Sequence, residues 1–226
     1  VEKVVNINSG TLNFKGNKKV GKIFQAELDK LGFKTYWVTY PKEIKRSGHL
    51  FAEMRGGKGQ NILLIGHLDT VFEPDHPFQK YTRKGDTAYG PGVSDMKAGD
   101  VSMIYIMKAL DKIGVLHDLN LTLAFTGDEE KTGGPVSIVR KELVEAGKWA
   151  NIGLGFEGAV GMNTGTIARR SSSSWVLTTT GIQGHSSQIF KDHLGYGAIF
   201  EASRILNAFR EELAPEEYLT FNPGTI

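Results

Sequence analysis

A short apolar run that ends in two polar residues constrains the fold of this chain more than any other feature. Leu63, Leu64 and Ile65 predict a buried β-strand, and His67 and Asp69 stand two residues apart at its end. Side chains at positions i and i+2 of a strand point to the same side, so both should emerge together. This pairing is typical of a metal-bound imidazole held by a carboxylate. A capped strand end with a chance histidine explains it equally well.

Strand and helix patterns alternate through most of the chain. Apolar and β-branched residues predict strands over residues 34–40, 50–55, 61–65, 119–125 and 152–156. Helical spacing predicts helices over residues 17–31, 95–113 and 135–147. The glycine-rich residues 56–59 join two of the strands into a hairpin-like pair, and the helix over 95–113, apolar on nearly every side, should be largely buried. The alternation predicts a three-layer α/β domain with a mixed sheet.

The pattern changes after about residue 166. Two arginines and a run of four serines over 169–174 are typical of a linker or crossing segment. A strand over 175–180 and a helix over 194–213 follow, which predicts a second domain that is entered but not completed. Both chain ends look abrupt, and we therefore expect a fragment of a longer protein.

Composition excludes several classes of function. The chain has 226 residues, a net charge of +2 and no cysteine. The near-neutral charge gives no reason to expect nucleic acid or an anionic membrane as a partner, and no run of 18 apolar residues is present. Without cysteine, disulfides, thiolate nucleophiles and cysteine-bound metals are excluded. The sequence leaves a cytoplasmic and a periplasmic or secreted location open.

Three further acidic signals stand at the ends of predicted elements. Asp95 follows the glycine-rich stretch 90–92 and begins a predicted helix, where an N-cap is the simpler explanation. Asp128, Glu129 and Glu130 follow the strand over 119–125, and three adjacent carboxylates repel one another. A solvated loop would tolerate this repulsion, and a bound cation would relieve it. Glu157 ends the next strand. The glycines at 90–92 do not form a P-loop pattern, which disfavours nucleotide binding.

Taken together, these residues form a pattern. The carboxyl ends of strands in an open α/β sheet converge on a ligand crevice, where we expect His67, Asp95, Glu130 and Glu157. One nitrogen and several oxygens without thiolate fit one catalytic zinc or a pair sharing a carboxylate, with cobalt or manganese as substitutes. The chemistry implied is hydrolysis by a metal-held water whose pKa falls toward ~7, with Glu129 as the general base.

Three segments resemble the motifs of the di-zinc metallopeptidases, in the order in which that family has them: 66–71 (GHLDTV), 90–97 (GPGVSDMK) and 128–130 (DEE). The family includes glutamate carboxypeptidases, aminoacylases, succinyl-diaminopimelate desuccinylase and peptidase T. The position of Glu157 is normally aspartate or glutamate in this family, and the glutamate found here resembles the carboxypeptidase branch. The resemblance covers essentially the whole chain. It implies the N-terminal part of an α/β/α zinc-exopeptidase catalytic domain over 1–168. Over 169–226 it implies the first part of an inserted ferredoxin-like α+β dimerisation domain.

The resemblance also implies a role for each metal ligand. His67, Asp95 and Glu157 would hold one zinc, and Asp95 would bridge to a second zinc that Glu130 also binds. Two metals in such sites lie roughly 3.5–4 Å apart. The family often has a cis peptide after the bridging aspartate, here between Asp95 and Met96.

Catalytic and partner roles follow from the same resemblance. Asp69 would orient His67, and Glu129 would be the general base and proton shuttle for cleavage of an amide bond in a peptide or N-acyl amino acid. His185, in the segment 181–187, would reach a partner's active site in a homodimer and stabilise the oxyanion, with a surface-loop histidine as the alternative. Asn222 resembles a substrate-contacting asparagine.

The chain departs from the family pattern in one respect. The second zinc is normally completed by a histidine near the C-terminus, and no residue after Ile226 is present. We expect the remaining histidines to be surface or turn residues: His49, His76, His117 and His193. The truncation leaves open whether the chain as it stands is active, and a non-catalytic zinc-binding or dimerisation protein is the alternative.

Overall fold

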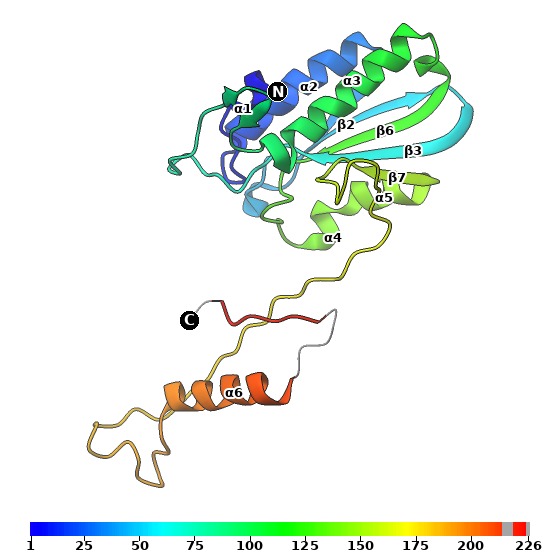
Figure 1. Cartoon of the computed structure of the whole chain (residues 1–226). Coiled ribbons are helices and arrows are strands. Elements are labelled where there is room, and N and C mark those ends of the chain that lie inside the picture. The colour runs from blue at the N-terminus through cyan, green and yellow to red at the C-terminus, as the bar shows by residue number, and fades with distance from the viewer. Residues whose placement is uncertain (214–218, 225–226) are drawn as a thin grey trace. The chain divides into compact units, whose positions relative to one another are not determined.

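Figure 1 shows the computed structural model of the chain, which describes residues 1–213 and 219–224. The chain forms two compact units, Val1–Met162 and Asn163–Ile226. The first unit holds every strand found in the described residues. The division falls close to the predicted boundary between residues 168 and 169, while the assignment of the second part to dimerisation stays a prediction.

A five-stranded mixed sheet forms the centre of the first unit. Its strands lie in the order β1 (Lys34–Val38), β2 (His49–Arg55), β6 (Leu119–Thr126), β3 (Lys58–His67) and β7 (Ile152–Gly155). β3 runs parallel to β6 and β7, whereas β2 pairs antiparallel with β1 and β6. The five predicted strands of this region and the mixed α/β class are thus confirmed.

Helices cover both faces of the sheet (Figure 1). α2 (Phe14–Lys30) and α3 (Ala98–Lys112) lie on one face, where their apolar side chains share a core with alternate residues of β2 and β6. α5 (Lys141–Trp149) lies on the other, where Leu143 and Ala146 pack against Phe51, Leu63 and Ala124. Successive strand residues face opposite sides, so each central strand supplies both cores.

The predicted pairing of the second and third strands is wrong. β2 and β3 are joined by the short turn after Arg55, but β6 lies between them and hydrogen bonds to both. β6 is buried at every position from Leu121 to Thr126, so an edge position would expose apolar surface to water. Local turn chemistry indicates that two strands are close, whereas burial decides which strand takes the centre.

The helix predicted over 95–113 is shorter and less buried than expected. The regular helix α3 begins at Ala98, and residues Val93–Lys97 form a separate kinked turn. Met103, Ile104 and Met107 face the core, but Ile106 is 40% exposed. A helix on the outer layer packs against the sheet with one face only, so apolar residues on the other face remain in water.

Other short elements complete the first unit. The helix predicted over 135–147 is divided at Arg140 into α4 (Val136–Val139) and α5. α1 (Glu2–Val5) precedes α2, and two short helical turns cover Lys42–Ile44 and Leu116–Asp118. β4 (Thr82–Lys84) and β5 (Thr87–Tyr89) form a separate two-stranded sheet.

The second unit contains one regular element in its described part, the helix α6 (Ala198–Glu212), within the predicted range 194–213. The strand predicted over 175–180 is absent, and Trp175 and Val176 are 91% and 92% exposed. A strand needs a partner for its backbone N–H and C=O groups, and no other strand exists among the described residues of this unit. In the described part of the chain, no single helix is both long enough and apolar enough to cross a membrane.

Candidate metal centre

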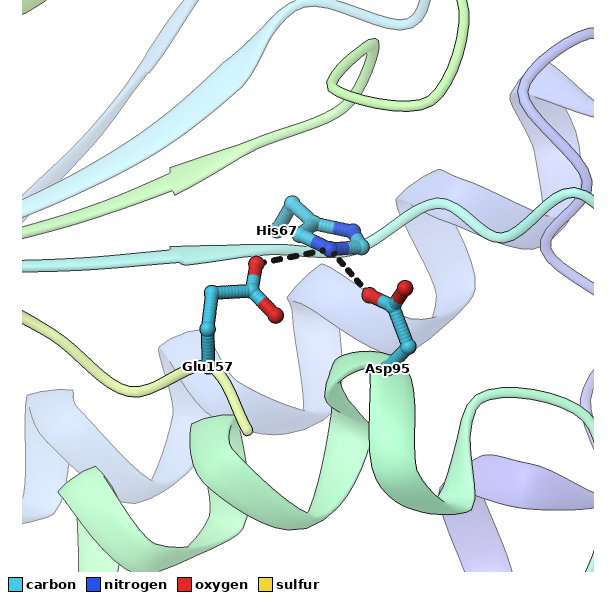
Figure 2. A group of neighbouring side chains, drawn as sticks. All are labelled: His67, Asp95 and Glu157. Carbon is cyan, nitrogen blue, oxygen red and sulfur yellow. Dashed lines mark hydrogen bonds and ion pairs between the residues drawn. The ribbon is translucent and has the colours of Figure 1, made fainter. Parts of the chain in front are cut away.

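His67 is the last residue of β3 and stands at the centre of an acidic cluster. Figure 2 shows its buried imidazole between two carboxylates that come from distant parts of the chain. The Nε2 atom lies 2.9 Å from Asp95 Oδ1 and 3.2 Å from Glu157 Oε1. These three residues offer donor atoms that all lie within 4.8 Å of one another, as a shared metal ion requires.

Sheet topology explains why Glu157 lies beside His67. β7 runs parallel to β3, and Gly155 is in register with Ile65, so both strands end at the same edge. Glu157 follows two residues after β7, as His67 follows two residues after Ile65. The prediction that strand ends bring these two side chains together is confirmed.

Asp95 reaches the cluster from the turn before α3, and its N-cap interpretation is wrong. The cap residue of α3 is Lys97, and Asp95 itself has a non-helical φ of −124° and ψ of 98°. Gly92, at a φ of 77°, lets the chain turn sharply ahead of it. The expected cis peptide between Asp95 and Met96 is present. This turn aims the Asp95 carboxylate at the end of β3 instead of at the amides of α3.

The turn after β6 adds a second group of donors. His67, Glu129 and Glu130 also offer ligand atoms within 4.8 Å of one another. Glu129 Oε2 lies 4.0 Å from His67 Nε2, and its side chain is 54% exposed. All four predicted ligands and the predicted base therefore gather at one edge of the sheet, while the role of each stays a prediction.

Asp69 is fully buried and takes more contacts than the sequence indicates. The Nδ1 atom of His67 lies 3.0 Å from the backbone oxygen of Asp69 and 3.5 Å from its carboxylate Oδ1. The same carboxylate accepts the backbone N–H groups of Glu129 and Glu130 and the hydroxyl of Thr11. Asp69 therefore connects the imidazole of His67 to residues 128–130, which we call the acidic turn.

Electrostatics at this edge are those of a crowded anionic site. Burial alone would lower the pKa of His67, but the hydrogen bond and charge of Asp69, with other carboxylates nearby, raise it to about 10. Burial and then the charge of Asp95 raise the pKa of Glu130 to about 7. Burial would raise the pKa of Asp69, but side-chain hydrogen bonds from His67 and Thr11 outweigh this effect and lower the pKa. A divalent cation would relieve the repulsion among these groups.

Asp128 has a different environment from its two acidic neighbours. Its buried carboxylate accepts hydrogen bonds from Arg140 Nη1 at 2.6 Å and from the backbone N–H of Gly133 at 2.8 Å. The Nη2 atom of Arg140 also donates to the backbone oxygen of Asp128 and to Thr132. Arg140 is a functional residue that no sequence motif indicates, because no local pattern links an arginine to an aspartate twelve residues earlier.

His49 corrects another expectation. It is fully buried, not a surface residue, and its Nδ1 accepts the N–H of Gly127 while its Nε2 lies 2.9 Å from the Val139 oxygen. His76, His117 and His193 are exposed as expected. His49 begins β2, which is buried on both faces, whereas the strand predicted from the sequence starts one residue later, at Leu50.

Asp100 lies beneath the cluster as an unexpected buried acid. Neither of its carboxyl oxygens has a hydrogen-bond partner among the described residues, and burial raises its pKa well above the usual range. A Cβ on Gly66 would stand 2.1 Å from Asp100 Oδ1, so only glycine lets helix and strand approach this closely. Burial therefore disfavours a negative charge on Asp100.

A cavity of about 420 Å³ opens onto the cluster. Its walls combine the donor residues with apolar and polar side chains of the neighbouring elements, namely Ile65, Gly66, His67, Met96, Thr126, Glu129, Thr132, Arg140, Leu143, Gly155 and Glu157. The volume is within the range of small-molecule ligand sites.

His185 and Asn222 belong to the second unit and are exposed. His185 Nδ1 lies 2.9 Å from the hydroxyl of Ser187. The metal cluster is built from residues of the first unit, and the roles of His185 and Asn222 stay predictions.

A mixed α/β sheet with an imidazole and several carboxylates at its strand ends is the architecture of a metallopeptidase catalytic domain. Residues 63–211 match the family described as Peptidase family M20/M25/M40, and the chain belongs to that family. The family resemblance drawn from the three sequence motifs is thereby confirmed.

Curated relatives cover most of this chain. It is 32% identical over 214 residues to carboxypeptidase G2 of Pseudomonas sp. (strain RS-16). This alignment covers 91% of the chain and 49% of carboxypeptidase G2. It is 29% identical over 201 residues to succinyl-diaminopimelate desuccinylase of Gluconobacter oxydans, with 84% and 49% covered. The chain thus spans about half the length of the curated relatives it matches.

Solved structures agree on the fold. Human carnosine dipeptidase 1 superposes with a TM-score of 0.56 at 18% identity, over 68% of this chain and 36% of that one. The metallo-carboxypeptidase Sso-CP2 of Sulfolobus solfataricus gives 0.54 at 21% identity, over 70% and 36%.

Proposed function

We propose that the protein is a metal-dependent hydrolase that cleaves an amide bond in a peptide or an N-acyl amino acid. The observation that carries this proposal is the pair of donor groups sharing His67, which open onto a cavity large enough for a small substrate. Carboxypeptidase G2 and the desuccinylases support the substrate class, because their names describe removal of a terminal residue or of a succinyl group.

The donor set fits two divalent metal ions. One would be held by His67, Asp95 and Glu157, and the second by Glu130 with Asp95 shared between them. The raised pKa of Glu130 supports this assignment, since a crowded acid that holds a proton is one that a cation would stabilise. Imidazole and carboxylate without thiolate favour zinc, with cobalt or manganese as substitutes. Such metals polarise a substrate carbonyl and lower the pKa of a coordinated water.

Glu129 is suited to be the general base. Its carboxylate lines the cavity beside His67 and is half exposed, so it can meet water and substrate. Its backbone N–H is bound by Asp69, which holds the start of the side chain in place. In the proposed reaction, Glu129 takes a proton from the attacking water and passes it to the leaving amine nitrogen.

The second unit would complete the site in a homodimer. We place His185 of one copy at the developing oxyanion in the other copy, and Asn222 at the substrate. Both assignments come from the resemblance of segments 181–187 and 221–224 to the family's dimerisation domain.

Replacement of Glu129 tests the proposed function. Glu129→Gln should lower kcat by at least ~10²-fold, the usual contribution of a general base, while metal content is unchanged. Turnover is measured on a panel of dipeptides and N-acyl amino acids, and metal content by atomic emission. Glu145→Gln, which replaces an exposed glutamate of α5, is the matched control and should change neither quantity.

Two outcomes would contradict parts of this assignment. Loss of zinc in step with activity would identify Glu129 as a ligand instead of a base. Full metal binding by the unmodified protein without turnover of any substrate would favour a non-catalytic metal-binding protein.

A further inference from the structure

A threonine near the N-terminus contacts the metal centre from outside every sequence motif. The Thr11 hydroxyl donates a hydrogen bond of 2.7 Å to Asp69 Oδ2, and both residues are buried. Thr11 lies 58 positions before Asp69, and it also lies outside residues 63–211, the range that matches the family. No local pattern indicates this contact.

The Asp69 carboxylate divides its contacts between its two oxygens. Oδ1 accepts the backbone N–H of Glu129 at 3.0 Å, and Oδ2 accepts that of Glu130 at 3.1 Å. Both bonds form only when the carboxylate plane faces the acidic turn. Thr11 adds a third donor at Oδ2, and His67 Nδ1 lies 3.5 Å from Oδ1. Thr11 therefore helps to keep the Asp69 carboxylate in the orientation in which it binds the backbone N–H groups of Glu129 and Glu130.

Backbone contacts fix Thr11 itself. The N–H of Thr70 donates to the Ser9 oxygen at 2.9 Å, and Gly10 and Thr70 form a parallel bridge. The side-chain amide of Asn17 donates to the Gly10 oxygen at 3.0 Å. Gly10 lies so close to the following loop that a Cβ would stand 2.7 Å from a backbone atom of Glu73. The segment carrying Thr11 is thus joined to the segment that follows β3.

We propose that Thr11 is a positioning residue of the metal centre. Its hydroxyl holds the Asp69 carboxylate in the orientation that binds the amides of Glu129 and Glu130, and so sets where these side chains meet a metal ion. This inference rests on the proposed function. Groups that orient ligands from outside the metal's own shell typically change metal affinity by ~10–100-fold when they are removed.

Cobalt titration tests the proposal without reference to activity. Thr11→Val keeps the shape of the side chain and removes the donor, and we expect Co²⁺ to bind at least ~10-fold more weakly by calorimetry, with altered Co²⁺ absorption bands. Thr11→Ser keeps the hydroxyl and should restore affinity and bands. Thr122→Val is the matched control: Thr122 is a buried threonine of β6 whose hydroxyl accepts from Arg55, and its loss should leave Co²⁺ binding unchanged.

A double variant shows whether Thr11 acts through Asp69. In an Asp69→Asn background, Thr11→Val should weaken Co²⁺ binding little further, because the oriented carboxylate is already lost. Unchanged Co²⁺ affinity in Thr11→Val, an equal loss in Thr122→Val, or full additivity with Asp69→Asn would each overturn the proposal. If the unmodified protein binds no Co²⁺, the proposed function itself fails, which is a different result from unchanged affinity in the variant.

Discussion

Adjacent residues of the acidic turn have opposite roles because burial separates them. Asp128 is buried in an ion pair with Arg140, whereas Glu129 is half exposed at the cavity. The sequence shows three neighbouring carboxylates but gives no sign that Asp128 is buried and paired with an arginine. In the structure, Asp128 anchors the turn and the two glutamates face His67. The charge of Asp128 stabilises the fold through its ion pair with Arg140, whereas the charge of Glu129 is available to a ligand in the cavity.

Substitutions at these neighbours should therefore differ in their effect on stability. Asp128→Asn leaves Arg140 without a charged partner, and should lower the free energy of unfolding by about 2–3 kcal/mol, somewhat below a fully buried pair because Arg140 is partly exposed. Glu129→Gln should change it by less than about 0.5 kcal/mol. Urea unfolding of both variants measures the difference. Equal losses at the two positions would contradict this division.

The approach of α3 to the sheet decides where Asp95 lies relative to the strand ends. A Cβ on Gly99, in the first turn of α3, would stand 2.1 Å from the backbone oxygen of Phe156. Gly66 allows the same close contact at the end of β3. Two glycines thus let the helix that follows Asp95 pack directly against the segments that carry His67 and Glu157.

Alanine substitution tests this packing. Gly99→Ala should force the helix away from Phe156 and lower the free energy of unfolding by about 1–3 kcal/mol, the usual cost of overpacking. Gly147→Ala, in α5, meets no atom within 4 Å and should stabilise by about 0.5–1 kcal/mol through helix propensity. Opposite signs for the same substitution, measured by thermal unfolding, are the expected result. A neutral Gly99→Ala would show that the contact is easily relieved.

At the scale of the molecule, the metal centre joins segments that the sequence keeps far apart. The turn before α3, the end of β3, the turn after β6 and the segment after β7 each contribute donors, and Thr11 adds a contact from the N-terminal segment. Metal ions held between these segments would oppose unfolding, because the unfolded chain cannot assemble the same site.

Metal addition should consequently stabilise the first unit. Zn²⁺ at 100 times its Kd adds about 2.7 kcal/mol, which corresponds to a rise in Tm of roughly 5–10 °C for a unit of this size. Differential scanning calorimetry with Zn²⁺ and after chelation measures this rise. Mg²⁺, which prefers oxygen ligands in octahedral geometry, should give a smaller shift. A Tm independent of Zn²⁺ would contradict binding at this site.

The α/β class, the five strands around the site and the residues at their ends could be predicted from the amino-acid sequence, because hydrophobic periodicity and motif spacing are local properties. Three features became visible only in the folded chain: β6 separates β2 from β3, Asp128 and His49 are buried, and Thr11 and Arg140 support the acidic turn. These features depend on which distant segments share a core, and chain-local patterns carry no information about such contacts. The strand predicted over 175–180 shows the same limit, since β-propensity specifies no pairing partner.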